Sequence, residues 1–557
     1  MFAPSSRLIA CLVNEGLMLA TYLPVSNLGP TADLGPVALL TLQDLSIVVA
    51  LAHTPPTDQH CSILFLNPLD LQCPIFVSTI ETASTMPAQL TECLCPSTLM
   101  RLVATRIGAV DNALLQEICA ELDSCVEHMT HLLVHPRPEP TLHSTAIEWE
   151  QSIIEGQNIH PMHKCRYTVA PTPRIEPETD LHNLTLRLVS MPADAVVVSG
   201  EYLVVMAKLV PADMVPIGRV PILVHPLQVP NVVSKFSEAT FHPFTVPALA
   251  QSSLRAVILP GLCGFAFKIP FSIKLTSSLR TCSPWSTSIG PSLARVLDRI
   301  VPKSNVLRIA AEHSTVRSKH SDFDIAKHLA CIIRDEFDAA LRERNEAVIV
   351  CAALTERPDG HTARIINLCN LDTRESRLEF LRIFVDLAFK AFLVPVIEHG
   401  FAFEAHQQNT LVRLRIPSPG DDSPVYPIGL IIRDFGGVRF HPDTLFKSTG
   451  MRVSLLPGNA NEAPDLKKVY KRLYHSLIQM HLHPLIRALG LHYSGEGWRI
   501  VRTQLEEYFK PGDIGHDLWL SSDTCQWKCL VRMRLKNLDT VSIDRDVPNV
   551  LLYRGEP

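Results

Sequence analysis

The stretches EAHQQNTLVRL, residues Glu404–Leu414, and IIRDFGG, residues Ile431–Gly437, decide how the C-terminal part of the chain folds. From Val412 onward apolar residues alternate with arginines, as in a half-buried β-strand, and a second apolar run ends just before Asp434. The intervening PSPGDDSPVYP is rich in turn-forming residues. The pattern predicts a helix-then-hairpin unit whose strand ends bring four polar side chains together. They are Glu404, His406, Gln408 and Asp434.

An Asn and an Asp-Phe-Gly triplet also hold magnesium and ATP in protein kinases. A kinase requires in addition a glycine-rich phosphate loop, a strand lysine and a catalytic HRD triplet. The segment before Lys208 offers one glycine instead of GxGxxG, and no HRD triplet with a downstream Asn is present. The sequence therefore argues against a protein kinase. It retains a narrower prediction, a carboxylate and amides that bind a metal nucleotide.

Composition limits the class of protein. A chain of 557 residues exceeds one core and predicts two to four domains. A formal net charge of -5 gives no basic field for nucleic acid, and no apolar run is long enough to predict a membrane helix. The 15 cysteines show no zinc spacing, which favours reduced, buried thiols. We expect a soluble, cytoplasmic protein.

The rest of the chain predicts an α+β fold with antiparallel sheets and helices. We expect an amphipathic helix over residues 7–23, a second helix over 110–134, and a linker at HPRPEPTLH, residues 135–143. Apolar runs such as AVVVSGEYLVVMAKLV, residues 195–210, mix with prolines and favour strands. Further helices are expected over 377–398, ended by Gly400, and over 464–490, kinked at Pro484.

Three further segments carry chemistry. In EWEQSIIEGQNIHPMHKCR, residues 148–166, histidines, a lysine and an arginine could clamp an anion, or form an ordinary surface loop. Residues 251–286 place hydroxyls and cations along strands, which suits phosphate or carboxylate binding but also a solvated strand face. No Walker-type glycine loop is present. WKCLVRMRL, residues 527–535, adds a basic segment that an exposed face would also explain.

Taken in order, these segments resemble the NRPS-independent siderophore synthetases, the IucA/IucC family. The family loop G-H-x-x-H-P-x-x-K is matched by residues 156–164, except that Gln157 replaces its first histidine. The closing K-x-L-x-x-M-R-L is matched from Lys528. The resemblance spans essentially the whole chain. Its other matched positions are Ser253, Arg255, Lys268, Thr276, Arg280, Glu404, His406, Gln408, Asn409, Arg433 and Asp434.

The resemblance implies a cupped-hand architecture in three parts: a thumb over residues 1–140, fingers over 141–370 and a palm over 371–557. It implies an ATP-dependent, AMP-forming ligase of siderophore biosynthesis. Such an enzyme adenylates a citrate-like polycarboxylic acid and condenses it with an amine or alcohol, giving an amide or ester. The nucleotide would lie between fingers and palm, so the Asp-Phe-Gly would belong to a magnesium-nucleotide site.

The resemblance also implies roles for individual residues. Arg255, Lys268, Arg280 and magnesium would neutralise the charge of ATP and acid at the reacting centre. Glu404 and Asp434 offer the oxygen ligands that magnesium prefers. Ser253, Thr276, His406 and Gln408 would bind the phosphates and the nucleotide, and His406 is also predicted to be catalytic. The acid substrate would be bound by His160, Lys164 and Lys528.

The sequence leaves several matters open. It does not identify the acid, the nucleophile or the choice between amide and ester, and a homodimer stays open. Gln157 leaves room for the same chemistry in a secondary-metabolite pathway that makes no siderophore. A degenerate, non-catalytic binding protein of the same fold is the alternative from another class.

Overall fold

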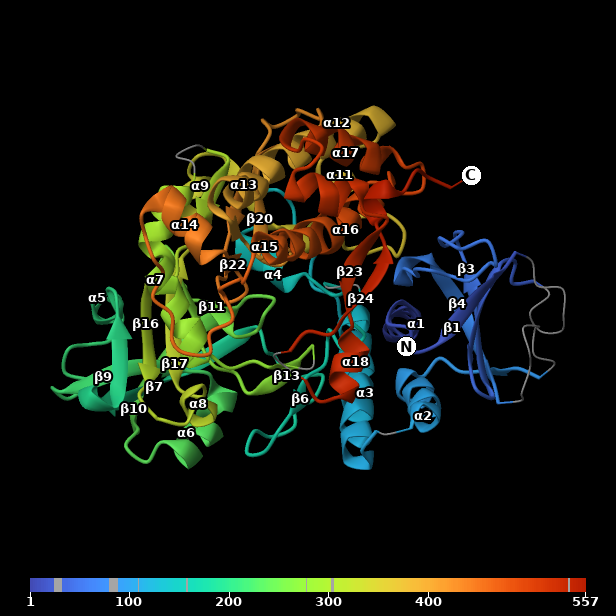
Figure 1. The fold of residues 1–557 in the computed structure, drawn as a ribbon. Coiled ribbons are helices and arrows are strands. Elements are labelled where there is room, and N and C mark those ends of the chain that lie inside the picture. Colours follow the sequence, from blue (N-terminus) through green and yellow to red (C-terminus); the bar gives the residue numbers. More distant parts are fainter. Residues whose placement is uncertain are drawn as a thin grey trace.

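The computed structural model describes residues 1–24, 33–79, 89–108, 110–156, 159–276, 278–301, 305–538 and 541–556. It shows the predicted mixed α+β fold, with antiparallel sheets and helices. Figure 1 shows three regions in sequence order: the N-terminal region at one side, a large sheet at the other, and the helical C-terminal region between and above them. Each region surrounds its own large hydrophobic cluster.

A five-stranded antiparallel sheet forms the N-terminal region, with helices packed on it. The helix expected over residues 7–23 instead begins at Phe2 and ends at Asn14, because Gly16 follows with φ +64 and residues 19–23 form a strand. This helix is buried on all sides from Pro4 to Asn14, so it is not amphipathic. The elements are α1 (Phe2–Asn14), β1 (Leu19–Leu23), β2 (Val37–Leu42), β3 (Leu45–Leu51), β4 (Leu71–Ser78), β5 (Thr91–Glu92), α2 (Pro96–Ile107) and α3 (Asn112–Val134).

The middle region is an eight-stranded antiparallel sheet in the order β8-β16-β17-β12-β11-β10-β7-β9. The run at 195–210, predicted as strand, divides into a short strand and the helix α5 (Tyr202–Ala207), because Gly200 at φ +65 ends the strand. Lys208 therefore ends a helix and is no kinase strand lysine. The strands are β7 (Asn183–Pro192), β8 (Val196–Ser199), β9 (Arg219–Val224), β10 (Thr240–Ala250), β11 (Ala256–Ile258), β12 (Phe265–Lys268), β16 (Ser314–Ser318) and β17 (Ala330–Asp335).

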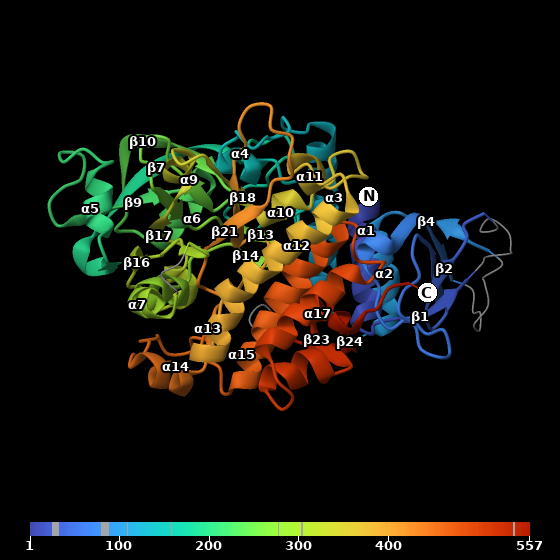
Figure 2. The same ribbon diagram turned by 90° about the horizontal axis from the view of Figure 1, so that it is seen from above.

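A small sheet and several helices accompany this large sheet. The small sheet has the order β14-β13-β6 and carries residues of the predicted phosphate segment. Helix α7 packs beside β16 (Figure 2). The additional elements are α4 (Ala146–Gln151), β6 (Tyr167–Thr168), α6 (Val229–Lys235), β13 (Ile273–Leu275), β14 (Ser278–Leu279), α7 (Pro284–Ile300), α8 (Phe323–Ala326), α9 (Asp338–Arg342), α10 (Cys351–Leu354) and α11 (Arg364–Leu368).

The predicted hairpin is the centre of the C-terminal region. β20 (Thr410–Arg415) and β21 (Pro427–Ile432) pair antiparallel, with Thr410 opposite Ile432. Two strands from earlier in the chain complete this sheet: β18 (Glu346–Val350) pairs with β20, and β15 (Leu307–Ile309) pairs parallel to β21. Arg413, expected to point to solvent, is buried and paired with Glu346 at 2.7 Å.

Helices cover this sheet, as Figure 2 shows from above. The helix expected over 377–398 is confirmed as one continuous run that stops at left-handed Gly400. The helix expected over 464–490 also forms, and a π-helical segment, Tyr474–Leu482, precedes Pro484. The elements are α12 (Arg374–Ala388), α13 (Val394–His399), β19 (Phe401–Ala402), β22 (Arg439–Phe440), α14 (Pro442–Thr449), α15 (Leu466–Leu473), α16 (His483–Ala488), α17 (Glu496–Tyr508), β23 (Thr524–Lys528), α18 (Leu530–Leu535) and β24 (Asp544–Pro548).

The N-terminal and C-terminal regions are joined by buried polar contacts. Glu15, after α1, accepts hydrogen bonds from the backbone N–H groups of Val531 and Arg532 at 2.9 and 2.7 Å. Arg534 on α18 forms an ion pair with Glu121 on α3 at 2.9 Å. The division at residues 140 and 370 stays a prediction. The strands β15 and β18, which precede residue 370, belong to the C-terminal sheet. Among the described residues, no helix combines the length and apolar character needed to cross a membrane.

Candidate active site

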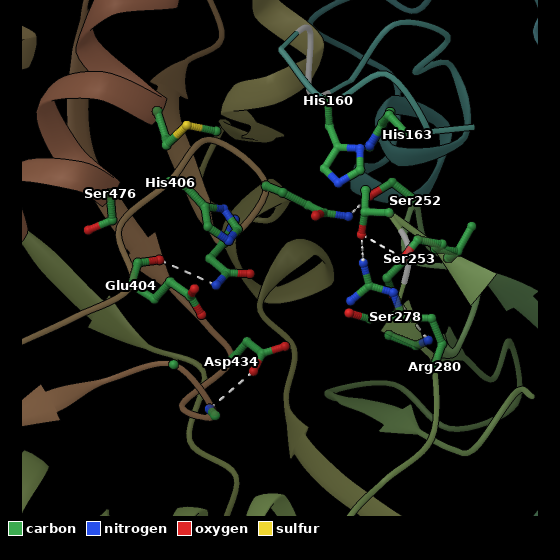
Figure 3. Close-up of a pocket in the computed structure, with 18 of the residues that line it drawn as sticks. His160, His163, Ser252, Ser253, Ser278, Arg280, Glu404, His406, Asp434 and Ser476 are labelled. Atoms are coloured by element: carbon green, nitrogen blue, oxygen red, sulfur yellow. Dashed lines mark hydrogen bonds between the residues drawn. The ribbon is translucent and has the colours of Figure 1, made fainter. Parts of the chain in front are cut away.

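The structure gathers every predicted site residue around one cavity of about 450 Å³. Figure 3 shows residues from three of the segments that supply them: His160 and His163 from one loop, Ser253 and Arg280 from the middle region, and Glu404, His406 and Asp434 from the hairpin. Nine Lys and Arg side chains line the cavity against two carboxylates, which gives it a large positive excess. The predicted residues that line it are His160, Lys164, Ser253, Arg255, Lys268, Thr276, Arg280, Glu404, His406, Gln408, Asp434 and Lys528.

The register of the hairpin explains why its polar residues converge. Since Thr410 lies opposite Ile432, the residues just before β20 and just after β21 lie side by side. The N–H of Arg433 donates to the carbonyl of Asn409 at 3.1 Å, which continues the ladder by one step. Beyond this step, the segment before β20 and the segment after β21 separate, and Gln408 and Asp434 face the cavity. The predicted convergence at the strand ends is confirmed.

Asp434 adopts a strained backbone conformation and pairs with a buried lysine. Its φ is +68, a region that non-glycine residues seldom occupy and that clusters at functional sites. Its Oδ2 accepts a hydrogen bond from Lys268 at 2.8 Å, and its Oδ1 accepts one from the N–H of Gly436 at 3.2 Å. Burial opposes ionisation of the carboxyl, but Lys268 and Arg255 outweigh it and hold the pKa of Asp434 well below its usual range.

The remaining residues of the Asp-Phe-Gly-Gly turn have separate structural tasks. Phe435 is fully buried in the hydrophobic core and anchors the turn. A Cβ at Gly437 would overlap with the carboxylate of Glu404, so glycine leaves room for the ion pair between Glu404 and Arg472. Burial opposes ionisation of Glu404, yet Arg472 lowers its pKa, so the side chain is an anion at neutral pH.

The donor set fits a magnesium ion that arrives with a nucleotide. Glu404 and Asp434 are carboxylates in the same cavity, and each keeps an oxygen that forms no ion pair with a Lys or Arg among the described residues. Magnesium is usually held by one or two carboxylates together with substrate phosphates. Within the described residues, no group of three or more His, Cys, Asp and Glu side chains is placed to hold a metal by itself.

The middle region contributes a row of cations and hydroxyls. Lys268 ends β12, and the loop before β11 carries Ser253 and Arg255. Arg280 donates to the hydroxyl of Thr276, and burial together with nearby Arg255 lowers the pKa of Arg280 to about 10, so it stays charged. Leu254 and Thr276 have φ values of +60 and +50, so three of the strained non-glycine residues, counting Asp434, lie in or beside this site.

The segment that leads to His160 and Lys164 is held by a residue that is distant in sequence, Glu356. The carboxylate of buried Glu356 accepts hydrogen bonds from three successive backbone N–H groups, those of residues 154, 155 and 156, at 3.0, 2.9 and 2.6 Å. Lys164 donates to the carbonyl of Ile153 at 2.9 Å. Burial, with Arg166 second, lowers the pKa of Lys164 to about 8. Burial, with Lys528 second, lowers the pKa of His160 to about 3. Gln157 lies outside the described residues.

Lys528 approaches the cavity from the last part of the chain. It ends β23, and the following helix α18 is held by Glu15. Burial, followed by repulsion from Arg472, lowers the pKa of Lys528. Gln408 and His406 are the two residues without a formal charge that are predicted to hold the nucleotide. Gln408 donates a long hydrogen bond to Ser252 at 3.4 Å, and burial is the main cause that lowers the pKa of His406.

Sequence reasoning missed several residues of the site. Arg472 on α15 lies in KKVYKRLYHS, which looks like a solvated helix face, but it pairs with Glu404 inside the cavity. Arg334 is the penultimate residue of β17, directly after an apolar run, and also lines the cavity. An arginine at the end of an apolar run is a usable signal, because a charge rarely follows such a run unless it has a buried partner. Glu356 gives no comparable signal.

The cavity, in which cations surround two carboxylates, is suited to anionic ligands and a metal ion. Comparisons with known proteins place the chain in a family. The IucA / IucC family model matches residues 145–356, and the model described as Ferric iron reductase FhuF-like transporter matches residues 378–541. The NRPS-independent siderophore synthetase rfs of Rhizopus delemar is 34% identical, covering 100% of this chain and 97% of that protein. The chain belongs to the NRPS-independent siderophore synthetases, as its motifs predicted.

More distant relatives and solved structures agree with this placement. The Spermidine-citrate ligase of Bacillus anthracis is 22% identical over 62% of this chain and 62% of its own length. The structure of the petrobactin biosynthesis protein AsbB of Bacillus anthracis has a TM-score of 0.78 at 18% identity, covering 99% of this chain and 95% of that one. ATP-bound aerobactin synthetase IucA of Klebsiella pneumoniae has a TM-score of 0.73 at 18% identity, covering 99% of both chains. These structures share the fold.

Proposed function

We propose that this synthetase uses ATP to adenylate a citrate-like polycarboxylic acid and passes the acyl group to an amine or alcohol. In the first step, a carboxylate oxygen of the acid attacks the α-phosphorus of ATP, and the bond to the bridging oxygen breaks to release pyrophosphate. In the second step, the amine or hydroxyl attacks the acyl carbon, loses its proton and displaces AMP. The class is that of its relatives, one of which is named as a citrate ligase.

The observation that carries this proposal is the charge of the cavity. Both reactants are polyanions that repel each other, and nine Lys and Arg side chains face them against two carboxylates. Arg255, Lys268 and Arg280 would neutralise the triphosphate and the charge that develops at the α-phosphorus. Ser253 and Thr276 would donate hydrogen bonds to phosphate oxygens, while His406 and Gln408 would hold the nucleotide.

Two further groups divide the cavity by ligand. Glu404 and Asp434 would hold a magnesium ion, which when bound with the nucleotide supplies additional positive charge at the phosphates. His160, Lys164 and Lys528 would bind the carboxylates of the acid. His160 would act there as a neutral imidazole, because its pKa of about 3 leaves it uncharged at neutral pH. A degenerate binding protein would have no need to retain the whole set of ion pairs around Asp434 and Glu404.

Product analysis tests the proposal. We expect the protein, incubated with Mg-ATP, citrate and hydroxylamine, to release AMP and pyrophosphate in equal amounts and to convert citrate to its hydroxamate. Hydroxylamine traps the acyl-adenylate without knowledge of the natural nucleophile. Reactions without acid serve as the control. Stoichiometric ADP and phosphate would reject adenylation. If citrate gives no product, a screen of other polycarboxylic acids by pyrophosphate release identifies or excludes an alternative acid.

A further inference from the structure

Glu312 is a buried carboxylate for which neither the motifs nor the proposed function assign a task. It lies in the connection between β15 and β16, and it is 1% exposed. Neither of its carboxylate oxygens accepts a hydrogen bond of normal geometry, and the backbone N–H of Phe435 interacts with them only weakly. Burial and nearby Asp434 raise the pKa of Glu312, while Lys268 and Arg334 oppose that rise. A buried carboxylate without hydrogen bonds is costly to the fold and requires an explanation.

The packing of α7 fixes this residue in place. Gly290 lies inside α7, and a Cβ there would overlap with the carbonyl oxygen and Cβ of Glu312. Glycine weakens a helix interior, so its presence here reflects the close approach of the helix to the 312 backbone. The glycine therefore lets α7 pack directly against the backbone of Glu312.

Glu312 and Asp434 face the same ammonium group from two sides. Lys268 Nζ lies 2.8 Å from Asp434 Oδ2 and 3.7 Å from Glu312 Oε1. Asp434 and Lys268 line the cavity, whereas Glu312 is not among the residues that line it. Lys268 itself is 3% exposed, so its buried charge needs an anionic partner.

The proposed function brings a second cation to Asp434. When a nucleotide-bound magnesium ion shares this carboxylate, the attraction between Asp434 and the Lys268 ammonium weakens. Glu312 is the other carboxylate that contacts Lys268 among the described residues. We propose that Glu312 is a positioning residue: it is the alternate countercharge that holds Lys268 when Asp434 binds the metal of the nucleotide. This inference rests on the proposed function.

The inference predicts which property of the enzyme depends on Glu312. Without this carboxylate, Lys268 stays with Asp434 and competes with the metal for its oxygens. The concentration of magnesium needed for half-maximal rate should rise. Binding of the acid should not change, because Lys164 and His160 lie in the separate loop 154–166.

Glu312→Gln and Glu312→Asp test the inference, with AMP formation followed against magnesium concentration at saturating acid. For Glu312→Gln we expect a rise of roughly fivefold or more in the half-saturating magnesium concentration, a rate at least about tenfold lower, and a KM for the acid within about twofold of the wild type. Glu312→Asp keeps the charge and should recover part of both losses. Glu336→Gln, which alters a half-buried carboxylate outside the cavity, is the matched control.

A double variant separates this role from a general loss of packing. In an Asp434→Asn background, Glu312→Gln should leave the affinity for Mg-ATP unchanged, since there is no carboxylate left to release. Titration calorimetry measures this affinity even if the double variant is inactive. An equal loss of affinity in both backgrounds, or a wild-type magnesium dependence in Glu312→Gln, would overturn the inference.

The outcomes also distinguish this inference from the proposed function. If the wild type forms no AMP, the proposed function itself fails. If the wild type forms AMP and Glu312→Gln matches it at every magnesium concentration, the positioning role alone fails. Thermal unfolding confirms that each variant is folded. If Glu312→Gln does not fold, the magnesium titration of Glu312→Asp, whose carboxylate is retracted by one methylene, decides the question.

Discussion

The two halves of the cavity treat charge in opposite ways. In the nucleotide half, formed by the hairpin and the strands β12 to β14, each carboxylate already faces a cation: Asp434 faces Lys268, and Glu404 faces Arg472. In the acid half, the loop 154–166, Lys164 and Arg166 donate to backbone carbonyls, and neither forms an ion pair with a described residue. The carboxylates of the nucleotide half are thus paired in advance, although cations outnumber them, while the loop of the acid half offers cations without any carboxylate in the cavity lining.

This difference also appears in the pKa values. Burial lowers the pKa of His160 to about 3, of Lys164 to about 8 and of Arg166 to about 10, and no nearby carboxylate restores any of them fully. In the nucleotide half, paired cations instead hold the pKa values of Asp434 and Glu404 low. Both halves therefore gain from an anionic ligand, but only the nucleotide half contains carboxylates that could also hold a metal ion.

The largest effect is expected from a change in the nucleotide half. Arg280→Ala and Asp434→Ala should each lower the rate of adenylation by about a hundredfold or more, because each removes a contact to charge that develops in the transition state. Pyrophosphate release measures the rate, and calorimetric unfolding confirms the fold. Arg382→Ala, on the exposed face of α12, is the matched control. Near-normal turnover in a folded variant would remove that residue from the nucleotide half.

Lys164→Ala should have a smaller and more selective effect. We expect the KM for the acid to rise about tenfold and the KM for ATP to stay within about twofold, because the lysine meets the acid alone. Its unfolding temperature should not fall, since a buried cation without a carboxylate partner contributes little stability. Steady-state titration of each substrate at saturating concentration of the other measures both constants. A raised KM for ATP with an unchanged KM for the acid would contradict the assignment of Lys164 to the acid half.

The smallest effect is expected from pH. Lys164 has its pKa lowered to about 8, so it loses its charge as pH rises through that value, and kcat/KM for the acid should fall by several-fold between pH 7.5 and about 9. His160 is already neutral, so it should cause no change between about pH 5 and 7. Lys164→Arg should move the fall to higher pH, because a guanidinium keeps its proton. A fall that stays near pH 8 in this variant belongs to another group.

Local patterns predicted the parts of the site that depend on neighbouring residues. The hairpin and the convergence of Glu404 and Asp434 follow from strand alternation and one turn-rich segment. The helix that ends at Gly400 was equally readable from its spacing and its stop signal. Each of these features is encoded within a few tens of residues, where periodicity carries information.

Partners that arrive from distant segments could not be predicted in this way. Glu356 fixes the loop before His160 from about 200 residues away, and Glu312 reaches Lys268 from another strand connection. Neither residue stands out in its local sequence. The error at residues 7–23 has a local cause, because apolar spacing continued past Gly16 although the backbone there already leaves the helix.

The contact between Glu15 and the backbone of Val531 joins residues that lie 516 positions apart. On a ribosome, α1 therefore emerges long before α18 and the strand that carries Lys528. During this interval the carboxylate of Glu15 has no access to the backbone N–H groups that it binds in the folded protein. The catalytic cavity is completed only after these later segments have been made, so enzymatic activity is expected only once they have left the ribosome.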